Sequence, residues 1–591
     1  MQKKTIWAFF AVLFVIGVNI HIPDLGETYV TRNLFMWVFI ALLNCALWLQ
    51  PIKNQTVKWH PIWAMGLFLP VIGSVLVLLG NIVGGYTAYH VGHYFLPGML
   101  LAFALFCAGL MQHDFSDDDW ARMLVIILAA LMPQYVLHMI STSPIVFFPV
   151  TLQIHQIFFK EFLGFGQYNL YGSFFAGLML LCVWAGAFLQ ISKRLRWVLL
   201  GLFFIYALDL ATMNSKTGLV GFWVGLSFMA IHALQNRDDT LIRRQVLQTF
   251  GLLLLAVVIG VISLYQADAK LTRTYSWTAE GHSFSTRYSM WIIALQSFAD
   301  APFFGHGLGS YIDSYTKYFA NNGLASGLTF YPTVSLPHNL LVHLLSETGL
   351  IGTLLLIGPL VWLAVHILRC VPRRWVVASL CFPVIFHTQL EYPYIASGGH
   401  YFILALALAL AVSRQDVLTH RLQLGDYGDT ARKSVFASVA FVSAGVIAVS
   451  LHMQWATYRA ATNFQKDSFL SLTEYVQRRF GSADVSHPVI GERMRAMSYL
   501  VLARKAMEAK RPDVLNKIVL PVLEQEVVPR YNNSGVWEIT LRTYFEVGQF
   551  DKAYALVDRI ALFDPKRAGQ YRVILDRSLK DYEVRPTRPQ Q

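Results

Sequence analysis

The chain has 591 residues, of which 55% are hydrophobic and only 14% are Asp, Glu, Lys or Arg. Soluble domains carry about 25% charged residues, so this chain has too few charges to cover a water-exposed surface of its size. The mean hydropathy of +0.47 excludes a soluble globular protein, a disordered chain and a disulfide-stapled secreted domain. The net charge of +12 is not gathered in basic runs interleaved with aromatic residues, which argues against a nucleic-acid partner. The composition predicts a polytopic membrane protein.

Apolar segments of the length that crosses a bilayer, about 20 residues, recur along most of the chain. We therefore expect an all-α fold, a polytopic transmembrane helical bundle of about thirteen spans. The segments near residues 375 and 399 are the shortest. The predicted spans lie near residues 5–22, 33–50, 62–80, 93–112, 122–140, 169–191, 196–212, 217–234, 248–265, 339–366, 375–390, 399–413 and 434–451.

The basic residues of the short loops predict the orientation of these spans. Eighteen Lys and Arg residues fall in alternate loops and at the N-terminus, and only three fall in the intervening short loops. Because cytoplasmic loops are enriched in Lys and Arg, the N-terminus is predicted to lie inside. The predicted organisation is N-terminal transmembrane helices in 1–265, a large outside loop in 266–338, C-terminal transmembrane helices in 339–451 and an outside helical domain in 452–591.

The outside tail has helical periodicity. Its stretch from Tyr544 to Pro565 is typical of one tetratricopeptide-type helical hairpin. A single hairpin of this kind cannot bury its apolar face alone, so we expect neighbouring helices to cover it.

The first candidate site surrounds His338 and Asn339 at the outer start of a span. Pro337 is typical of a first helical turn, so we expect His338 at a helix N-terminus. The dipole there disfavours an imidazolium, and a neutral imidazole can act as a base. The alternative is an interfacial capping histidine. Glu347 lies deeper, and we expect it to bond a neighbouring helix rather than His338.

A second candidate site combines Arg287 with the glycine-rich turn from Gly305 to Gly309. The guanidinium fork of an arginine suits phosphate. Backbone amides of such a turn can form an anion nest, although a tight loop explains the glycines equally well. Three further polar clusters lie at predicted outer helix ends, where each could simply be a solvated terminus: Lys216 with Asn214, Gln167 with Asn169, and His387 with Glu391.

Together these motifs resemble the O-antigen ligase/polymerase superfamily, and most closely its PglL-type protein O-oligosaccharyltransferases, which glycosylate pilins. The His338-Asn339 pair with Glu347-x-Gly349-x-x-Gly352 is shared by ligases and polymerases. The Leu-Glu391-Tyr-Pro piece and the helical tail favour the protein-directed branch. One difference is Ser-Lys216-Thr, where the family usually has Ser-Arg-Thr; the charge is kept but the bidentate fork is lost.

The resemblance implies transfer of a preassembled glycan from undecaprenyl pyrophosphate to Ser or Thr hydroxyls of a periplasmic acceptor protein such as a pilin. The enzyme would lie in the inner membrane of a Gram-negative bacterium, with its active site on the periplasmic side and with no cofactor or metal. His338 would be the base, and Arg287 would neutralise the leaving pyrophosphate. The substrate-binding residues implied are Lys216, Gln167, Asn169, Asn339, His387 and Glu391.

Three other functions compete with this interpretation. A lipopolysaccharide O-antigen ligase would use the same donor with a glycolipid acceptor, and an O-antigen polymerase would extend a glycan. A flippase or transporter is less favoured, because intramembrane charges are few and internal symmetry is absent from the sequence.

The topology is directly testable. A periplasm-active reporter fused after residue 460 should be active, because an odd number of spans carries the tail to the outside. Activity of a cytoplasm-specific reporter at the same position would contradict the predicted orientation.

Overall fold

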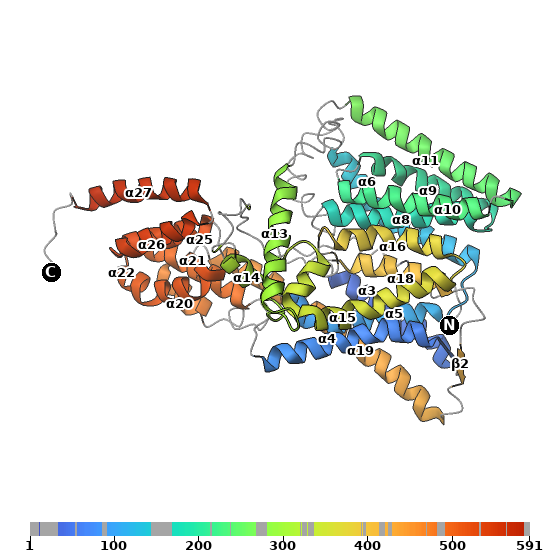
Figure 1. Cartoon of the computed structure of the whole chain (residues 1–591), viewed down its shortest axis with the longest axis horizontal. Helices are drawn as coiled ribbons and strands as arrows, with labels where there is room; N and C mark the ends of the chain where they lie inside the picture. Colours follow the sequence, from blue (N-terminus) through green and yellow to red (C-terminus); the bar gives the residue numbers. More distant parts are fainter. Residues whose placement is uncertain are drawn as a thin grey trace. The chain divides into compact units, whose positions relative to one another are not determined.

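The structure is a computed structural model of the chain. It describes residues 11, 34–53, 56–84, 91–142, 168–212, 215–236, 238–266, 281–318, 321, 328, 336–391, 393, 397–412, 420–423, 428–467, 470–480, 491–530, 534–562 and 564–583. These residues fold into helices and one two-stranded sheet (Figure 1). The all-α prediction is confirmed.

The chain divides into two compact units. We call residues Met1–Gly80, Gly92–Ala279 and Ile351–Trp455 the transmembrane unit, and residues Asn81–Val91, Glu280–Leu350 and Ala456–Gln591 the tail unit. The helices that lie wholly or largely in the transmembrane unit are α3 (Leu34–Lys53), α4 (Pro61–Val83), α5 (Val91–Met111), α6 (Asp117–Thr142), α8 (Tyr168–Phe188), α9 (Lys193–Thr212), α10 (Lys216–Gln235), α11 (Thr240–Gln266), α15 (Leu340–Cys370), α16 (Arg374–Thr388), α18 (Gly398–Val412) and α19 (Gly428–Asp467).

Helix α8 is the centre of the transmembrane unit. Its apolar window is 100% buried, and it packs against α6, α9, α10, α11, α16 and α18. Small residues let its neighbours approach: a Cβ on Gly218 of α10 would lie 2.6 Å from the backbone of Gly172 in α8. Such close crossings stabilise membrane helices, because dispersion contacts replace the hydrophobic effect between them.

Most predicted spans correspond to described helices. Six helices are long and apolar enough to cross a bilayer: Pro61–Val83, Asn169–Phe188, Lys216–Gln235, Thr240–Gly260, Leu340–Cys370 and Lys433–His452. Shorter apolar helices cover Met36–Leu49, Leu96–Met111, Arg374–Thr388 and Gly398–Ala411. The span predicted near 5–22 lies outside the described residues. The total of thirteen stays a prediction.

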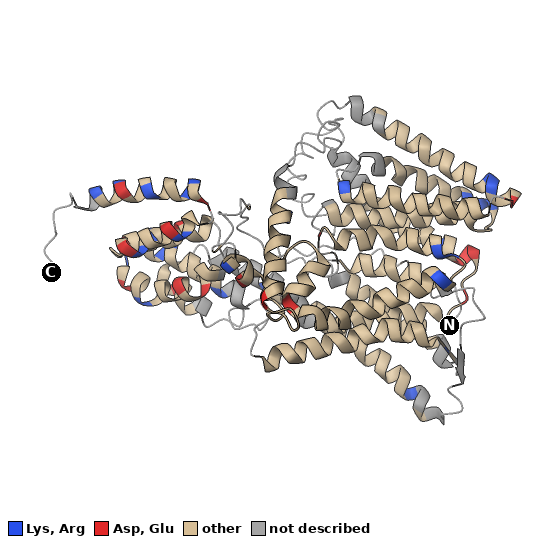
Figure 2. Ribbon diagram, in the orientation of Figure 1, with Lys and Arg blue, Asp and Glu red and all other residues tan. Residues whose placement is uncertain are grey.

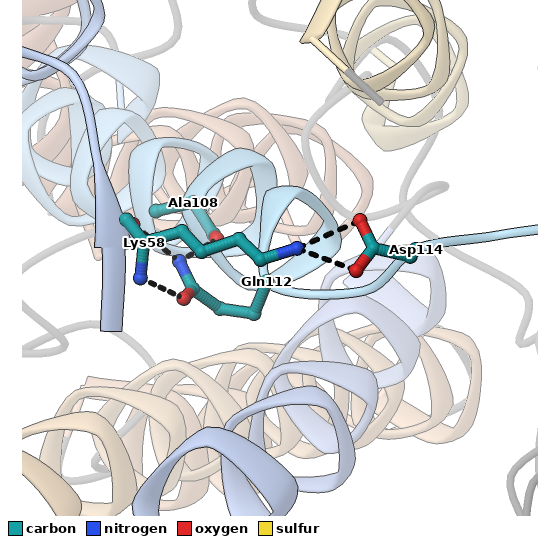
Figure 3. Close-up of polar contacts among 4 residues, drawn as sticks. All are labelled: Lys58, Ala108, Gln112 and Asp114. Atoms are coloured by element: carbon teal, nitrogen blue, oxygen red, sulfur yellow. Dashed lines mark hydrogen bonds and ion pairs between the residues drawn. The ribbon is translucent and has the colours of Figure 1, made fainter. Parts of the chain in front are cut away.

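Loops that the sequence assigns to the cytoplasm contact one another. Strand β1 (Thr56–Trp59) follows α3, and it pairs antiparallel with β2 (His420–Gln423), which lies between α18 and α19. Lys58 of β1 bonds both carboxylate oxygens of Asp114 at 2.7 Å (Figure 3). Gln112 pairs with the backbone of Lys58 through both ends of its amide, at 2.8 and 2.9 Å (Figure 3).

The loop before α9 also contacts a loop that the sequence assigns to the cytoplasm. The Gln190 and Ser192 amides donate to Asp117 and Asp118 at the start of α6, at 2.9 and 3.1 Å. In Figure 2 most charged residues of the transmembrane unit gather at one end of its helices. The predicted topology requires these loops to lie on the same side of the membrane. Their contacts therefore support an even number of spans between residues 53 and 420.

The tail unit has one hydrophobic core that includes parts of the predicted outside loop. Buried residues of α13 (Gly281–Asp300) and α14 (Tyr311–Tyr318), such as Ile293 and Tyr315, belong to the same core as those of the C-terminal helices. Those helices are α20 (Leu472–Phe480), α21 (Gly491–Glu508), α22 (Pro512–Val514), η4 (Leu515–Val519), α23 (Leu520–Val522), η5 (Leu523–Val527), α24 (Val528–Arg530), α25 (Ser534–Glu546), α26 (Phe550–Ala561) and α27 (Pro565–Glu583).

The predicted helical hairpin is the pair α25 and α26. Helices α21, α23 and α24 pack on α25, and α27 packs on α26. Trp537 and Val557 are each 1% exposed as a result. The expectation that neighbouring helices cover this pair is confirmed.

Helix α15 is broken at Gly349, whose φ of 63° and ψ of −170° are not helical. The chain after α13 packs against this break, because the Leu350 amide donates to the Pro302 carbonyl at 2.8 Å. A Cβ on Gly349 would lie 2.4 Å from the carbonyl carbon and oxygen of Phe303, and a Cβ on Gly305 would lie 2.4 Å from those of Glu347. Both glycines have positive φ, so backbone conformation and space exclude other residues.

Substituting Gly349 tests this contact. Gly349→Ala should lower the melting temperature of the detergent-purified protein, since a left-handed non-glycine backbone costs about 1–3 kcal/mol before the clash is counted. Gly358→Ala in the same helix is the matched control, because a Cβ there meets nothing within 4 Å. Equal melting temperatures for the two variants would contradict the packing described here.

Candidate functional site

Helix α13 and the start of α15 are joined next to His338. The Trp291 indole Nε1 donates to the Pro337 carbonyl at 2.9 Å. Arg287 lies four residues before Trp291 on α13, so the two side chains share one face of that helix. Arg287 is half-buried. The hydrogen bond therefore ties the peptide before His338 to a point one turn from Arg287.

His338 has a strained backbone and lies outside the helix. Helix α15 begins at Leu340, so the prediction of Pro337 in the first turn was wrong. Asn339 caps the helix instead: its Oδ1 accepts from the Val342 amide at 3.0 Å. The φ of His338 is 54°, in the left-handed region. Non-glycine residues in that region cost of order 1–3 kcal/mol, and such strain concentrates at functional sites.

The Glu347 carboxylate contacts His343 and the residue that follows the glycine-rich turn. Both Glu347 and His343 are 1% exposed, and Glu347 Oε2 lies 3.1 Å from His343 Nε2. Glu347 Oε1 accepts from the Tyr311 amide at the start of α14, at 3.1 Å. The expectation that Glu347 bonds a neighbouring helix is confirmed.

The amides of the glycine-rich turn are used within the protein. Those of His306 and Gly307 donate to the carbonyls of Ser346 and Glu347, at 3.2 and 2.8 Å. The Leu308 amide donates to Asn81 Oδ1 at 2.9 Å. These bonds favour the tight-loop interpretation over an anion nest, because the amides already have acceptors.

A second polar cluster surrounds Ser173 inside the transmembrane unit. Ser173 Oγ lies 2.6 Å from His387 Nδ1 and 2.7 Å from His400 Nε2. All three side chains are at most 1% exposed. A hydroxyl has one proton to donate, so at least one of the two imidazoles must donate to Ser173. The contact joins helices α8, α16 and α18.

Asn169 connects this cluster to the start of α10. Its carbonyl accepts from Ser173 Oγ at 3.1 Å, and its side-chain Oδ1 accepts from Ser215 Oγ at 3.3 Å. Ser215 caps α10 by accepting from the Gly218 amide at 3.1 Å. Lys216, half-buried, is the first residue of that helix. Separate sequence motifs thus meet around α8.

Of the remaining predicted residues, one is described by the structure and two are not. Glu391 is 1% exposed, and its amide donates to the His387 carbonyl at 2.9 Å. Gln167 and Asn214 lie outside the described residues. In the part of the chain that the structure describes, no three His, Cys, Asp or Glu side chains are grouped so as to hold a metal ion.

The sequence prediction of the site omitted Trp291, Ser173 and His400. His400 is a polar residue inside an otherwise apolar segment, and such residues are functional candidates by default, so this signal would have found it. Ser173 had no comparable signal, since serine is common in transmembrane helices.

Comparison with known proteins gives one match. Residues 201–357 match the O-antigen ligase family, a segment that runs from α9 into α15 and contains Lys216, Arg287, His338 and Asn339. No curated protein matches the chain. Members of this family use lipid-linked glycans, so the match supports glycan transfer by a ligase-type transferase. The chain also has the apolar helices of a multi-pass membrane protein, and its residues 201–357 are similar to the O-antigen ligase family.

Proposed function

We propose that the chain transfers a preassembled glycan from undecaprenyl pyrophosphate to Ser or Thr hydroxyls of periplasmic proteins such as pilins. The observation that carries the catalytic assignment is the strained His338 backbone beside the Trp291–Pro337 hydrogen bond. That bond ties the residue before His338, the proposed base, to the helix that carries Arg287. His338 and Arg287 both lie in the segment that matches the family.

In the proposed reaction the acceptor hydroxyl attacks the anomeric carbon of the donor sugar. His338 takes the hydroxyl proton as the new carbon–oxygen bond forms. The bond from the anomeric carbon to the pyrophosphate oxygen breaks, and undecaprenyl pyrophosphate leaves. Arg287 stabilises the negative charge that develops on the leaving group. For Lys216, Gln167, Asn169, His387 and Glu391 we propose contacts with donor and acceptor groups, as the resemblance implies.

The shared core of the tail unit supports a protein acceptor. Helix α13 carries Arg287, and its residues Met290, Ile293 and Ala294 are buried in the same core as the C-terminal helices. A protein bound by those helices would be held by the same rigid unit as Arg287 and His338. The second candidate is a lipopolysaccharide O-antigen ligase, which the matched family's own description favours.

One co-expression experiment separates the two acceptors. The chain is produced with a defined undecaprenyl-linked glycan, a pilin and a lipopolysaccharide core acceptor. Intact-mass analysis of the pilin and electrophoresis of the lipopolysaccharide then identify the product. Glycan on the pilin alone supports the proposal, and glycan on the lipopolysaccharide alone supports the ligase.

His338→Asn should reduce transfer by about 10²–10⁴-fold, the usual contribution of a general base. Asparagine tolerates the left-handed backbone, so this variant removes the imidazole without adding the strain of His338→Ala. The measurement is the initial rate of glycan transfer by purified protein of unchanged melting temperature.

His306→Asn is the matched control. The structure gives His306 a bond from Nε2 to the Ser297 carbonyl at 2.9 Å. It should lose stability but retain its rate per folded molecule. A rate for His338→Asn close to that of the unmodified protein would remove His338 as the base.

Trp291→Phe should slow transfer roughly tenfold at saturating donor, because it keeps an aromatic ring but removes a hydrogen bond of about 0.5–1.5 kcal/mol. Trp362→Phe is the control, since Trp362 is 42% exposed on α15. Equal rates for both variants would show that the Trp291–Pro337 bond does not position His338.

A further inference from the structure

The segment between α13 and α14, residues 301–310, contains the glycine-rich turn and carries two exposed aromatic side chains at its tip. Phe303 is 62% exposed and Phe304 is 75% exposed, the latter among the most exposed large apolar side chains described. No charged residue occurs between Asp300 and Asp313. Adjacent exposed phenylalanines without a charge beside them are unfavourable in water, so they indicate a surface that meets an apolar partner.

The tip is rigid, which distinguishes it from a loose surface loop. The Gly305 amide donates to the Ala301 carbonyl at 2.9 Å, which closes the turn around the two phenylalanines. The Pro302 carbonyl accepts from Leu350. The backbone of Phe303 rests on Gly349 without space for a Cβ. The turn therefore holds both rings in a fixed position beside the break in α15.

Exposed apolar side chains form one face of α15 after that break. Leu350, bonded to the turn, is 43% exposed, and the helix that continues from it is a candidate membrane span. Large apolar residues recur along this face as in a lipid-exposed helix, namely Ile351, Leu354, Leu355, Val361, Trp362, Val365 and Leu368. The phenylalanine pair is thus tied, through the Pro302–Leu350 bond, to a helix that is long and apolar enough to cross a membrane.

We propose that Phe303 and Phe304 insert into the outer leaflet of the bilayer and form an interfacial anchor. The partner is the boundary between lipid headgroups and acyl chains, into which interfacial segments bury Phe, Trp and Leu side chains. Because α13 ends at Asp300, immediately before the turn, the anchor fixes the depth of the helix that carries Arg287 relative to the membrane surface. This role is independent of which acceptor the enzyme uses.

The test measures the depth of a probe at residue 304 in the full-length protein. Cys370 is the exposed member of the described cysteines, so Cys370→Ser provides the background. Phe304→Cys is labelled with an environment-sensitive fluorophore, and the protein is placed in nanodiscs with spin-labelled lipids. Leu354→Cys, 58% exposed on α15, marks the lipid interior, and Lys580→Cys, exposed on α27, marks the solvent.

The anchor predicts a blue-shifted emission at residue 304. It also predicts stronger quenching by a spin label near the headgroup than by one deep in the acyl chain, with the reverse order at residue 354. The signal of labelled Cys370→Ser alone is subtracted. Emission and quenching at residue 304 equal to those at residue 580 would overturn the anchor. A shift that appears only when an acceptor protein is added would also overturn it and assign the pair to that protein.

Discussion

The part of the candidate site that contains Arg287 and His338 depends on one backbone contact, between the turn at residues 301–310 and the break in α15. Gly305 and Gly349 each pack against the other segment's backbone. The Glu347 carbonyl accepts from Gly307 of the turn, and its carboxylate accepts from the Tyr311 amide at the start of α14. Packed segments of this kind have few alternative arrangements, because any shift leaves buried amides without acceptors. The contact fixes the end of α13 against the first part of α15, which belongs to the tail unit up to Leu350.

Hydrogen-bond satisfaction explains why polar residues collect where they do. The Ser173 hydroxyl, the two imidazoles bonded to it and Asn169 lie among apolar helices, where water cannot replace a missing partner. Each must find its partner on a neighbouring helix. The result is a junction of α8, α10, α16 and α18 in which one residue's position depends on several others. A junction built this way is preorganised, because its hydrogen bonds fix the side chains before any ligand binds.

Tertiary contacts decided several features that a local pattern cannot report. Helix α15 begins at Leu340 with Asn339 as its cap, and the Pro337 carbonyl accepts from the Trp291 indole instead of from the helix. The glycines of the turn looked equally suited to an anion nest. The Gly307 amide instead donates to the Glu347 carbonyl on α15, and the Gly305 amide donates to the Ala301 carbonyl. Neither outcome is encoded by helix propensity.

The sequence by itself determined the all-α class, the positions of most apolar helices and the grouping of basic loops. Hydropathy and loop charge are local properties, and they decide which segments insert into a bilayer and in which orientation. It also identified Arg287 and His338 as candidate residues, since their types and motifs are local. Only the tertiary structure joined α13 and the C-terminal helices in one core and paired His387 with His400 through Ser173. Those contacts link residues far apart in the chain. Which residues meet is set by close packing of small side chains and by the need of every buried polar group for a partner.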